Sequence, residues 1–323
     1  MSGNLFNVRV EAVTDEAPGI RSFVISRIDG GAFDAYEPGA HLDVTSPSGI
    51  TRQYSLCGDP DHRDHHVFAV KLEPASRGGS RSLHEDVKVG GQLLVSEPRN
   101  LFRLHDTARE HVLVAAGIGI TPLLSMAYKL TKESAPFALH YFVRSEEHAA
   151  FRSLLSQKPF VDRATLHVGV EPESLDAALL GIVERIAPHA HVYTCGPGAF
   201  MDRVVDIARR RVPEDAIHIE RFSASPVASG VVAPVAAAFE VQVASSGKTV
   251  RVEPGTSIVD ALATIGVHVE TACREGLCGT CMVNVVSGEA DHRDECMSKA
   301  EREAGKICCC VSRARSSVLV LDL

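Results

Sequence analysis

Residues 273–281 read Cys273-Arg-Glu-Gly-Leu-Cys278-Gly-Thr-Cys281, and three adjacent cysteines follow at residues 308–310. Seven of the nine cysteines of this 323-residue chain lie within its last 51 residues. A disulfide framework suits a small secreted domain, whereas in a longer chain without an export signal such a cluster more often binds metal. This stretch therefore predicts a small metal-stapled domain over residues 239–323.

The spacing C-x4-C-x2-C is typical of the loop that holds a plant-type 2Fe-2S cluster, whose fourth thiolate comes from a later cysteine. Gly276 and Gly279 allow the loop to bend around inorganic sulfide and to direct amide groups toward it. A zinc site with four cysteine ligands is the alternative, but zinc has no use for the third thiolate of the loop. The spacing thus favours an iron–sulfur cluster with Cys273, Cys278 and Cys281 as ligands.

The fourth ligand is expected to be Cys308, Cys309 or Cys310. Adjacent side chains of an extended segment point to opposite faces, so only one of the three can face the cluster well. The other two, together with Cys57 and Cys296, are interpreted as buried apolar thiols.

The remainder of the chain shows two patterns. Residues 1–103 contain short β-type runs separated by glycine and proline turns, which predict an antiparallel barrel. Over residues 104–224, apolar strands such as 112–116 alternate with helical stretches, which predicts a doubly wound α/β domain. Residues 225–238 contain two prolines, small residues and no charge, and are interpreted as a linker.

Composition excludes several classes of partner. The formal charge of −8, from 33 Lys and Arg against 41 Asp and Glu, offers no basic stripe for nucleic acid. The apolar runs are far shorter than the ~20 residues that span a bilayer, and no basic segment leads into an apolar stretch at the N-terminus. We expect a soluble, cytoplasmic protein without a membrane partner, and a monomer is the simplest assembly.

Two segments of the barrel region have side chains suited to a phosphate and a flat ring. In Arg52-Gln-Tyr54-Ser55, Arg52 and Tyr54 lie on one face of a strand, so that one can pair with phosphate while the other stacks on a ring. The glycine-rich loop at residues 77–82 leads into a short helix and offers amides and hydroxyls to an anion.

Two turns in the α/β region follow predicted strands. Gly117-Ile-Gly119-Ile-Thr121-Pro122 links a strand to a helix, with Thr121 as the expected N-cap. Residues 195–198, Cys-Gly-Pro-Gly, follow a later strand. Both turns belong at the carboxyl edge of the parallel sheet, where ligands bind.

With these motifs in this order, the whole chain resembles the phthalate dioxygenase reductase and vanillate demethylase reductase family. The resemblance implies a multidomain fold with an antiparallel β-barrel flavin domain, a doubly wound nucleotide-binding α/β domain, and an α+β ferredoxin-like (β-grasp) domain.

The resemblance also assigns roles to individual residues. It implies FMN at Arg52, Tyr54, Ser55, Val70, Lys71, Gly78, Gly79, Ser80, Thr121 and Phe222, and the nicotinamide nucleotide at Gly117, Gly119, Cys195, Gly196 and Pro197. Ser55 and Cys195 are assigned to the hydride-transfer site. Matching Cys310-Val-Ser-Arg to the family favours Cys310 as fourth ligand, although the triple cysteine departs from the family pattern. Residues 291–294 and 319–323 are interpreted as structural.

The predicted function is that of an NADH-dependent reductase that passes electrons through FMN and a 2Fe-2S cluster to a Rieske-type aromatic oxygenase. A flavin is required because hydride delivers two electrons and the cluster accepts one. Glu146 and Glu147, after the second α/β strand, favour NADH over NADPH. A stand-alone diaphorase and a zinc-binding module are the alternatives.

Overall fold

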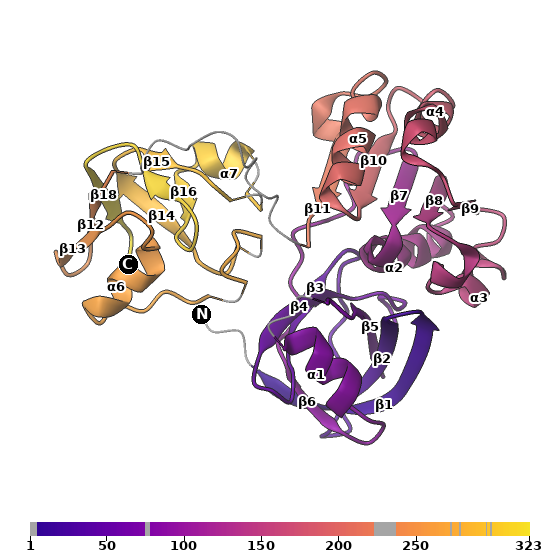
Figure 1. The fold of residues 1–323 in the computed structure, drawn as a ribbon, viewed down its shortest axis with the longest axis horizontal. Coiled ribbons are helices and arrows are strands. Elements are labelled where there is room, and N and C mark those ends of the chain that lie inside the picture. Colours follow the sequence, from indigo (N-terminus) through magenta and orange to yellow (C-terminus); the bar gives the residue numbers. More distant parts are fainter. Residues whose placement is uncertain are drawn as a thin grey trace. The chain divides into compact units, whose positions relative to one another are not determined.

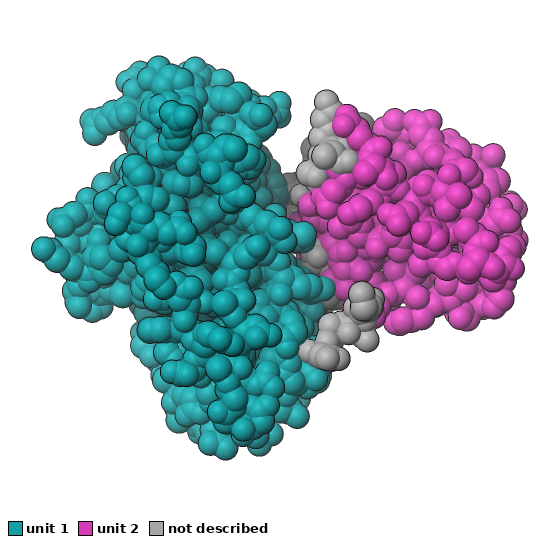
Figure 2. Space-filling view, turned by 180° about the vertical axis from the view of Figure 1, so that it is seen from behind, with its two compact units in different colours: residues 1, 3–221 teal, residues 2, 222–323 magenta. Residues whose placement is uncertain are grey.

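The computed structural model describes residues 5–74, 78–222, 237–271, 273–277, 279–294, 296–297 and 299–323, without the side chains of Lys299 and Ala300. The described chain divides into two compact units, one up to Arg221 and the other from Phe222 onward (Figure 2). Unit 1 contains both larger predicted regions, so the boundary expected near residue 104 lies inside one compact unit. The boundaries of the three predicted domains stay a prediction.

The first part of unit 1 is an antiparallel sheet of six strands in the order β4-β3-β6-β1-β2-β5. Its elements are β1 (Phe6–Ala17), β2 (Ile20–Arg27), β3 (His41–Thr45), β4 (Thr51–Ser55), β5 (His66–Lys71), α1 (Gly79–Asp86) and β6 (Gln92–Val95). A bridge between Leu56 and Phe68 links the two edge strands, so the sheet curves into a half-barrel. Leu83, on α1 (Figure 1), packs in the barrel core and so anchors the helix there.

The second part of unit 1 is a parallel sheet in the order β11-β10-β7-β8-β9. Its elements are β7 (His111–Ala116), η1 (Gly117–Gly119), α2 (Ile120–Lys132), β8 (Phe137–Val143), η2 (Glu146–His148), α3 (Arg152–Leu155), β9 (Ala164–Val168), α4 (Pro172–Val183), β10 (His191–Cys195), α5 (Gly198–Ala208), η3 (Glu214–Ala216) and β11 (Ile217–Glu220).

Strand β7 explains why helices cover both faces of this sheet. Leu113 and Ala115 join the core with α2 and α3, whereas Val112 and Val114 join the core with α4 and α5. A continuous apolar strand therefore buries alternate side chains in two cores. Helices lie on both faces of the sheet in Figure 1, which confirms the doubly wound prediction.

Unit 2 is a small α+β structure. Its elements are β12 (Phe239–Val243), β13 (Thr249–Val252), α6 (Ile258–Thr264), β14 (Met282–Ser287), β15 (Ala290–Asp291), α7 (Lys299–Glu303), β16 (Lys306–Cys308), β17 (Arg313–Ala314) and β18 (Val318–Leu321). The main sheet has the order β13-β12-β18-β14-β16, with β12 and β18 parallel. Ser257 caps α6 by accepting a hydrogen bond from the Asp260 amide at 3.1 Å. The ferredoxin-like fold is confirmed.

None of the helices in the described ranges is long and apolar enough to cross a membrane.

Candidate functional site

Strand β4 presents the predicted flavin-facing residues. Arg52 and Tyr54 are both partly buried, and the Tyr54 ring tilts against Phe68 with centroids 5.7 Å apart. Burial raises the pKa of Tyr54 to about 12, although the Arg52 charge opposes the shift. The Arg52 guanidinium donates to the Thr51 carbonyl at 2.7 Å. The strand therefore holds a cation and a neutral aromatic ring side by side.

The start of α1 lies against Arg52. Gly78 has a φ of +112°, in the left-handed region, and the described side chains provide no cap for the helix. A Cβ at Gly79 would lie 3.4 Å from Arg52 Cγ, so the first turn packs on the Arg52 stem. The backbone amides of the first turn of α1 and the Arg52 guanidinium thus lie close together, an arrangement that suits a phosphate group. The Ser80 hydroxyl accepts a hydrogen bond from the Glu73 amide at 3.2 Å.

The two predicted residues on β5, Val70 and Lys71, lie in different surroundings. Val70 is buried in the barrel core, and its carbonyl lies 2.9 Å from His84 Nε2. Lys71 is exposed and forms an ion pair with Glu73 at 2.9 Å. The Val70 side chain is therefore a core side chain, and Lys71 reaches solvent.

The two predicted nucleotide turns meet at the carboxyl edge of the parallel sheet. A Cβ at Gly119 would lie 2.2 Å from the Cys195 carbonyl oxygen and 2.6 Å from the Gly196 nitrogen. Gly117 has a φ of +55°, and Pro197 immediately precedes α5. Backbone contact between the turns thus requires glycine at position 119.

The expectation that Thr121 caps the helix is wrong. The η1 turn runs directly into α2, which begins at Ile120 with Gly119 in the capping position. Thr121 is buried inside the first turn, where its hydroxyl donates to the Ile118 carbonyl at 3.0 Å.

Glu220 is a candidate site residue that the sequence analysis missed. Its carboxyl accepts a hydrogen bond from Ser55 Oγ at 3.1 Å, and strand pairing places it beside Cys195. Burial raises the Glu220 pKa to about 8, against the effect of the Ser55 hydrogen bond. Burial, and then the Glu220 charge, raise the pKa of the Cys195 thiol well above its usual value. The two predicted catalytic residues therefore share a neighbour that lies at the end of β11.

Phe222 follows two residues after Glu220, and its side chain is 42% exposed. Its placement by the flavin stays a prediction.

The predicted cluster loop brings its described sulfur atoms near backbone donors. The Glu275 amide donates to Cys273 Sγ at 3.3 Å. Gly276 has a φ of +73°, and a Cβ there would lie 2.6 Å from Val311 Cγ2, so only glycine fits. Cys278 lies outside the described residues. This packing suits a loop that wraps an inorganic cluster.

The three adjacent cysteines differ in their contacts. The Cys308 and Cys310 thiols both hydrogen-bond to Cys281, which lowers the Cys281 pKa well below its usual range. The Cys281 interaction raises the pKa of Cys310, and an amide hydrogen bond from Gly276 opposes that shift. Cys309 is fully buried, and its amide donates to the Cys281 carbonyl at 3.2 Å.

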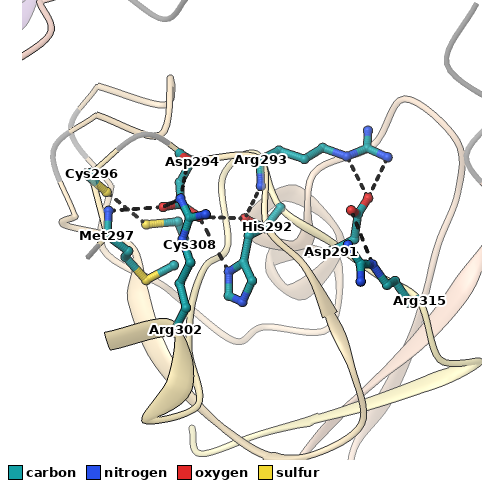
Figure 3. Close-up of polar contacts among 10 residues, drawn as sticks. Asp291, His292, Arg293, Asp294, Cys296, Met297, Arg302, Cys308 and Arg315 are labelled. Atoms are coloured by element: carbon teal, nitrogen blue, oxygen red, sulfur yellow. Dashed lines mark hydrogen bonds and ion pairs between the residues drawn. The ribbon is translucent and has the colours of Figure 1, made fainter. Parts of the chain in front are cut away.

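Asp294 organises the segment that faces Cys308, as Figure 3 shows. It is buried and accepts hydrogen bonds from the Met297 amide, Arg302 and Ser312. The neighbouring Asp291 pairs with Arg293 at 2.8 Å near the surface. These contacts agree with the structural role expected for residues 291–294.

Comparisons with known proteins support both units. Residues 241–315 match the 2Fe-2S iron-sulfur cluster binding domain family. The chain is 40% identical over 323 residues to vanillate O-demethylase oxidoreductase of Pseudomonas sp. (strain HR199 / DSM 7063), covering 99% of this chain and 100% of that protein. It is 42% identical over 316 residues to oxidoreductase NdmD of Pseudomonas putida, covering 96% of this chain but only 52% of NdmD.

A solved structure of phthalate dioxygenase reductase aligns with a TM-score of 0.72 and 36% identity, covering 99% of this chain and 98% of that one. That protein is described as a modular structure for electron transfer from pyridine nucleotides to a 2Fe-2S centre. The similarity therefore extends over the half-barrel, the parallel sheet and unit 2.

Proposed function

The chain belongs to the family of the vanillate O-demethylase and phthalate dioxygenase reductases, and we propose that it carries electrons from NADH to a Rieske-type oxygenase through FMN and a 2Fe-2S cluster. It is an oxidoreductase, the reductase component of an oxygenase system.

The contact between Ser55 and Glu220, with Cys195 on the adjacent strand, carries the proposal. It joins the strand expected to face the flavin to the strand edge expected to hold the nucleotide. When bound, a flavin accepts hydride and releases electrons singly. Ser55 and Cys195 are proposed to position the nicotinamide ring, and Glu220 to orient the Ser55 hydroxyl. The raised pKa of about 8 keeps Glu220 largely neutral at neutral pH.

FMN rather than FAD is proposed because Arg52 and the first turn of α1 offer one phosphate pocket. Tyr54 supplies the ring for stacking. Flavin released by heat from the purified protein should migrate as FMN on chromatography. FAD as the main species would contradict this proposal.

NADH is proposed because Glu146 and Glu147 follow the carboxyl end of β8, the strand beside β7. Acidic side chains there repel a 2′-phosphate. Arg152 pairs with Glu146 at 2.7 Å and weakens this repulsion, so the preference rests mainly on Glu147. We expect a higher kcat/KM for NADH than for NADPH, and equal values would overturn the preference.

The proposed cluster ligands are Cys273, Cys278, Cys281 and Cys310. Cys310 interacts with Cys281 and accepts from the Gly276 amide of the same loop, whereas Cys308 also contacts Cys296. Thiolates supplied with backbone donors are the usual environment of such clusters.

The whole proposal is tested by anaerobic mixing of the purified protein with NADH. We expect bleaching of flavin and cluster absorbance, followed by reduction of an oxygenase that contains a Rieske centre. A colourless protein would contradict the proposal. Reduction of dyes without any oxygenase would favour a diaphorase.

A further inference from the structure

A pair of thiols next to the cluster loop remains outside the proposed electron path. Cys296 Sγ and Cys308 Sγ lie 3.4 Å apart, one on the segment after β15 and the other at the end of β16 (Figure 3). This distance places the two sulfur atoms in direct contact. A disulfide bond has its sulfurs about 2.05 Å apart, so closure needs only a small displacement.

The two thiols differ in accessibility. Cys308 is fully buried, whereas Cys296 is partly exposed. A small oxidant can therefore reach Cys296 first, and the buried Cys308 thiol lies in contact with it. This is the arrangement of an attacked thiol and a resolving thiol.

A metal site is less well supported by the same residues. Asp294 completes a group whose ligand atoms lie within 4.8 Å of one another. However, Asp294 Oδ2 already accepts from the Met297 amide at 3.1 Å and from Arg302 at 3.3 Å. Ser312 donates to Oδ1 at 3.3 Å. The carboxylate thus already has three hydrogen-bond donors, one of them the Arg302 cation, and this disfavours a metal ion beside the two thiols.

We propose that Cys296 and Cys308 form a peroxide-responsive dithiol. Hydrogen peroxide oxidises the Cys296 thiol to a sulfenic acid and releases one water. The Cys308 sulfur then attacks the sulfenic sulfur, the S–S bond forms, and a second water leaves. In total two thiols and one hydrogen peroxide give one disulfide and two water molecules. The inference rests on the proposed function in one respect, since Cys310 as fourth ligand means that the Cys308 sulfur is not needed to bind iron.

The location gives the modification a structural consequence. Cys308 pairs with Met282 of β14, directly after the proposed ligand Cys281. A disulfide would tie the segment at residues 296–297 to β16, which pairs with the strand that begins directly after Cys281. The two cysteines can therefore form a disulfide beside the cluster loop under oxidising conditions, and a reductant can convert that disulfide back to two thiols.

The test uses the holoprotein with hydrogen peroxide in slight excess and a metal chelator present. Free thiols are then alkylated, and tryptic peptides are analysed by mass spectrometry without reduction. Cleavage isolates Cys296 in residues 294–299 and the triple cysteine in residues 307–313. We expect a cross-linked pair of these peptides, lighter than their sum by two hydrogen atoms, which dithiothreitol separates.

Three variants locate the bond. Cys296→Ala should abolish the cross-link and keep NADH-driven dye reduction. Cys309→Ser should retain the cross-link, because Cys309 is buried without a contact to Cys296 among the described interactions. Cys308→Ser should abolish the cross-link and keep the cluster absorbance.

Several outcomes would overturn the inference. They are alkylation of both thiols after peroxide, oxidation of Cys296 to a sulfinic acid without a cross-link, and a cross-link that persists in Cys308→Ser. Bound zinc that the chelator releases, with both thiols left reduced, would instead make this a metal site. Loss of the cluster in Cys308→Ser before any peroxide is added would contradict the assignment of Cys310 as fourth ligand. The presence or absence of the cross-link in the unaltered protein would still show whether Cys296 and Cys308 form a disulfide.

Discussion

Glu220 links the two sheets of unit 1 through a single hydrogen bond from Ser55. Burial raises its pKa to about 8, so the carboxyl is mainly neutral below that pH and charged above it. Glu220→Gln keeps a neutral side chain of the same size at every pH. We expect this variant to reduce flavin with NADH at the unaltered rate well below pH 8, and to lack the change in rate that the unaltered protein shows near pH 8. Stopped-flow absorbance measures both profiles.

Glu220→Ala is the matched control because it removes the contact altogether. A hydrogen bond worth about 1 kcal/mol predicts a loss of roughly fivefold in the rate. If the rate of flavin reduction has the same pH profile in the unaltered protein and in Glu220→Gln, then titration of Glu220 does not affect the reaction.

Substitution of Cys310 tests which cysteine is the fourth ligand of the cluster. Cys310→Ser should remove the reduced 2Fe-2S signal in low-temperature electron paramagnetic resonance, because an alkoxide forms less readily than a thiolate and suits iron–sulfur ligation less well. NADH-driven flavin reduction should remain. Cys309→Ser should keep a normal signal, and the reverse result would shift the ligand by one residue.

Ser55 and Cys195 could be proposed as site residues from the sequence because each belongs to a recognisable motif. Glu220 could not, since its role depends on a contact with Ser55, which lies 165 residues earlier in the chain. An acidic residue at the end of a strand is ordinary in a sequence. Only the tertiary arrangement turns it into a site residue.

At the scale of elements, the start of α2 shows where local patterns mislead. Thr121 followed by Pro122 is a typical cap sequence, yet the helix begins earlier, at Ile120. The η1 turn presses Gly119 against the Cys195 carbonyl, and this tertiary contact sets where the chain turns. Strands and helices were predictable from periodicity, whereas this boundary was not.

Gly119→Ala tests that contact. The new Cβ would lie 2.2 Å from a backbone oxygen that has little freedom to move, so the two turns must separate. We expect a KM for NADH raised at least about tenfold, a loss of about 1.4 kcal/mol or more in binding. The cluster spectrum should not change, because unit 2 is untouched.

Gly181→Ala is the control for Gly119→Ala. It lies within α4, and a Cβ there meets no atom within 4 Å. Alanine should stabilise this helix by up to about 1 kcal/mol and leave the KM unaltered. Similar KM values for the two variants would show that the turn contact does not hold the nucleotide.

At the scale of the whole molecule, the proposed flavin and cluster sites belong to separate compact units. Tyr54→Ala removes ring stacking worth about 0.5–1.5 kcal/mol, so flavin affinity should fall by up to about tenfold. Cluster absorbance per chain should stay constant, because the proposed thiolate ligands all lie in unit 2. Tyr54→Phe should bind flavin normally, and joint loss of both chromophores would contradict this modular arrangement.

Acid sensitivity should also differ between the units. Burial is the first cause that lowers the pKa to about 4 for five histidines, all in unit 1, namely His41, His66, His111, His140 and His218. Unfolded histidine titrates near 6.5, so the unfolded state binds more protons between these values. Stability is therefore greatest above about pH 6.5 and falls toward pH 4, by up to about 1.4 kcal/mol per pH unit for each proton.

Glu220 acts with the opposite sign, because its raised pKa lowers stability as the pH rises from about 4.5 to about 8. The single proton of Glu220 opposes the protons of as many as five histidines, so the net effect of acid should be to destabilise unit 1. Urea unfolding of the full chain, followed by flavin fluorescence for unit 1 and cluster absorbance for unit 2, measures the two midpoints. We expect the flavin midpoint to fall between about pH 6.5 and about pH 5 by clearly more than the cluster midpoint, because all five of these histidines lie in unit 1. Midpoints that fall together would show that the buried histidines do not control the acid response.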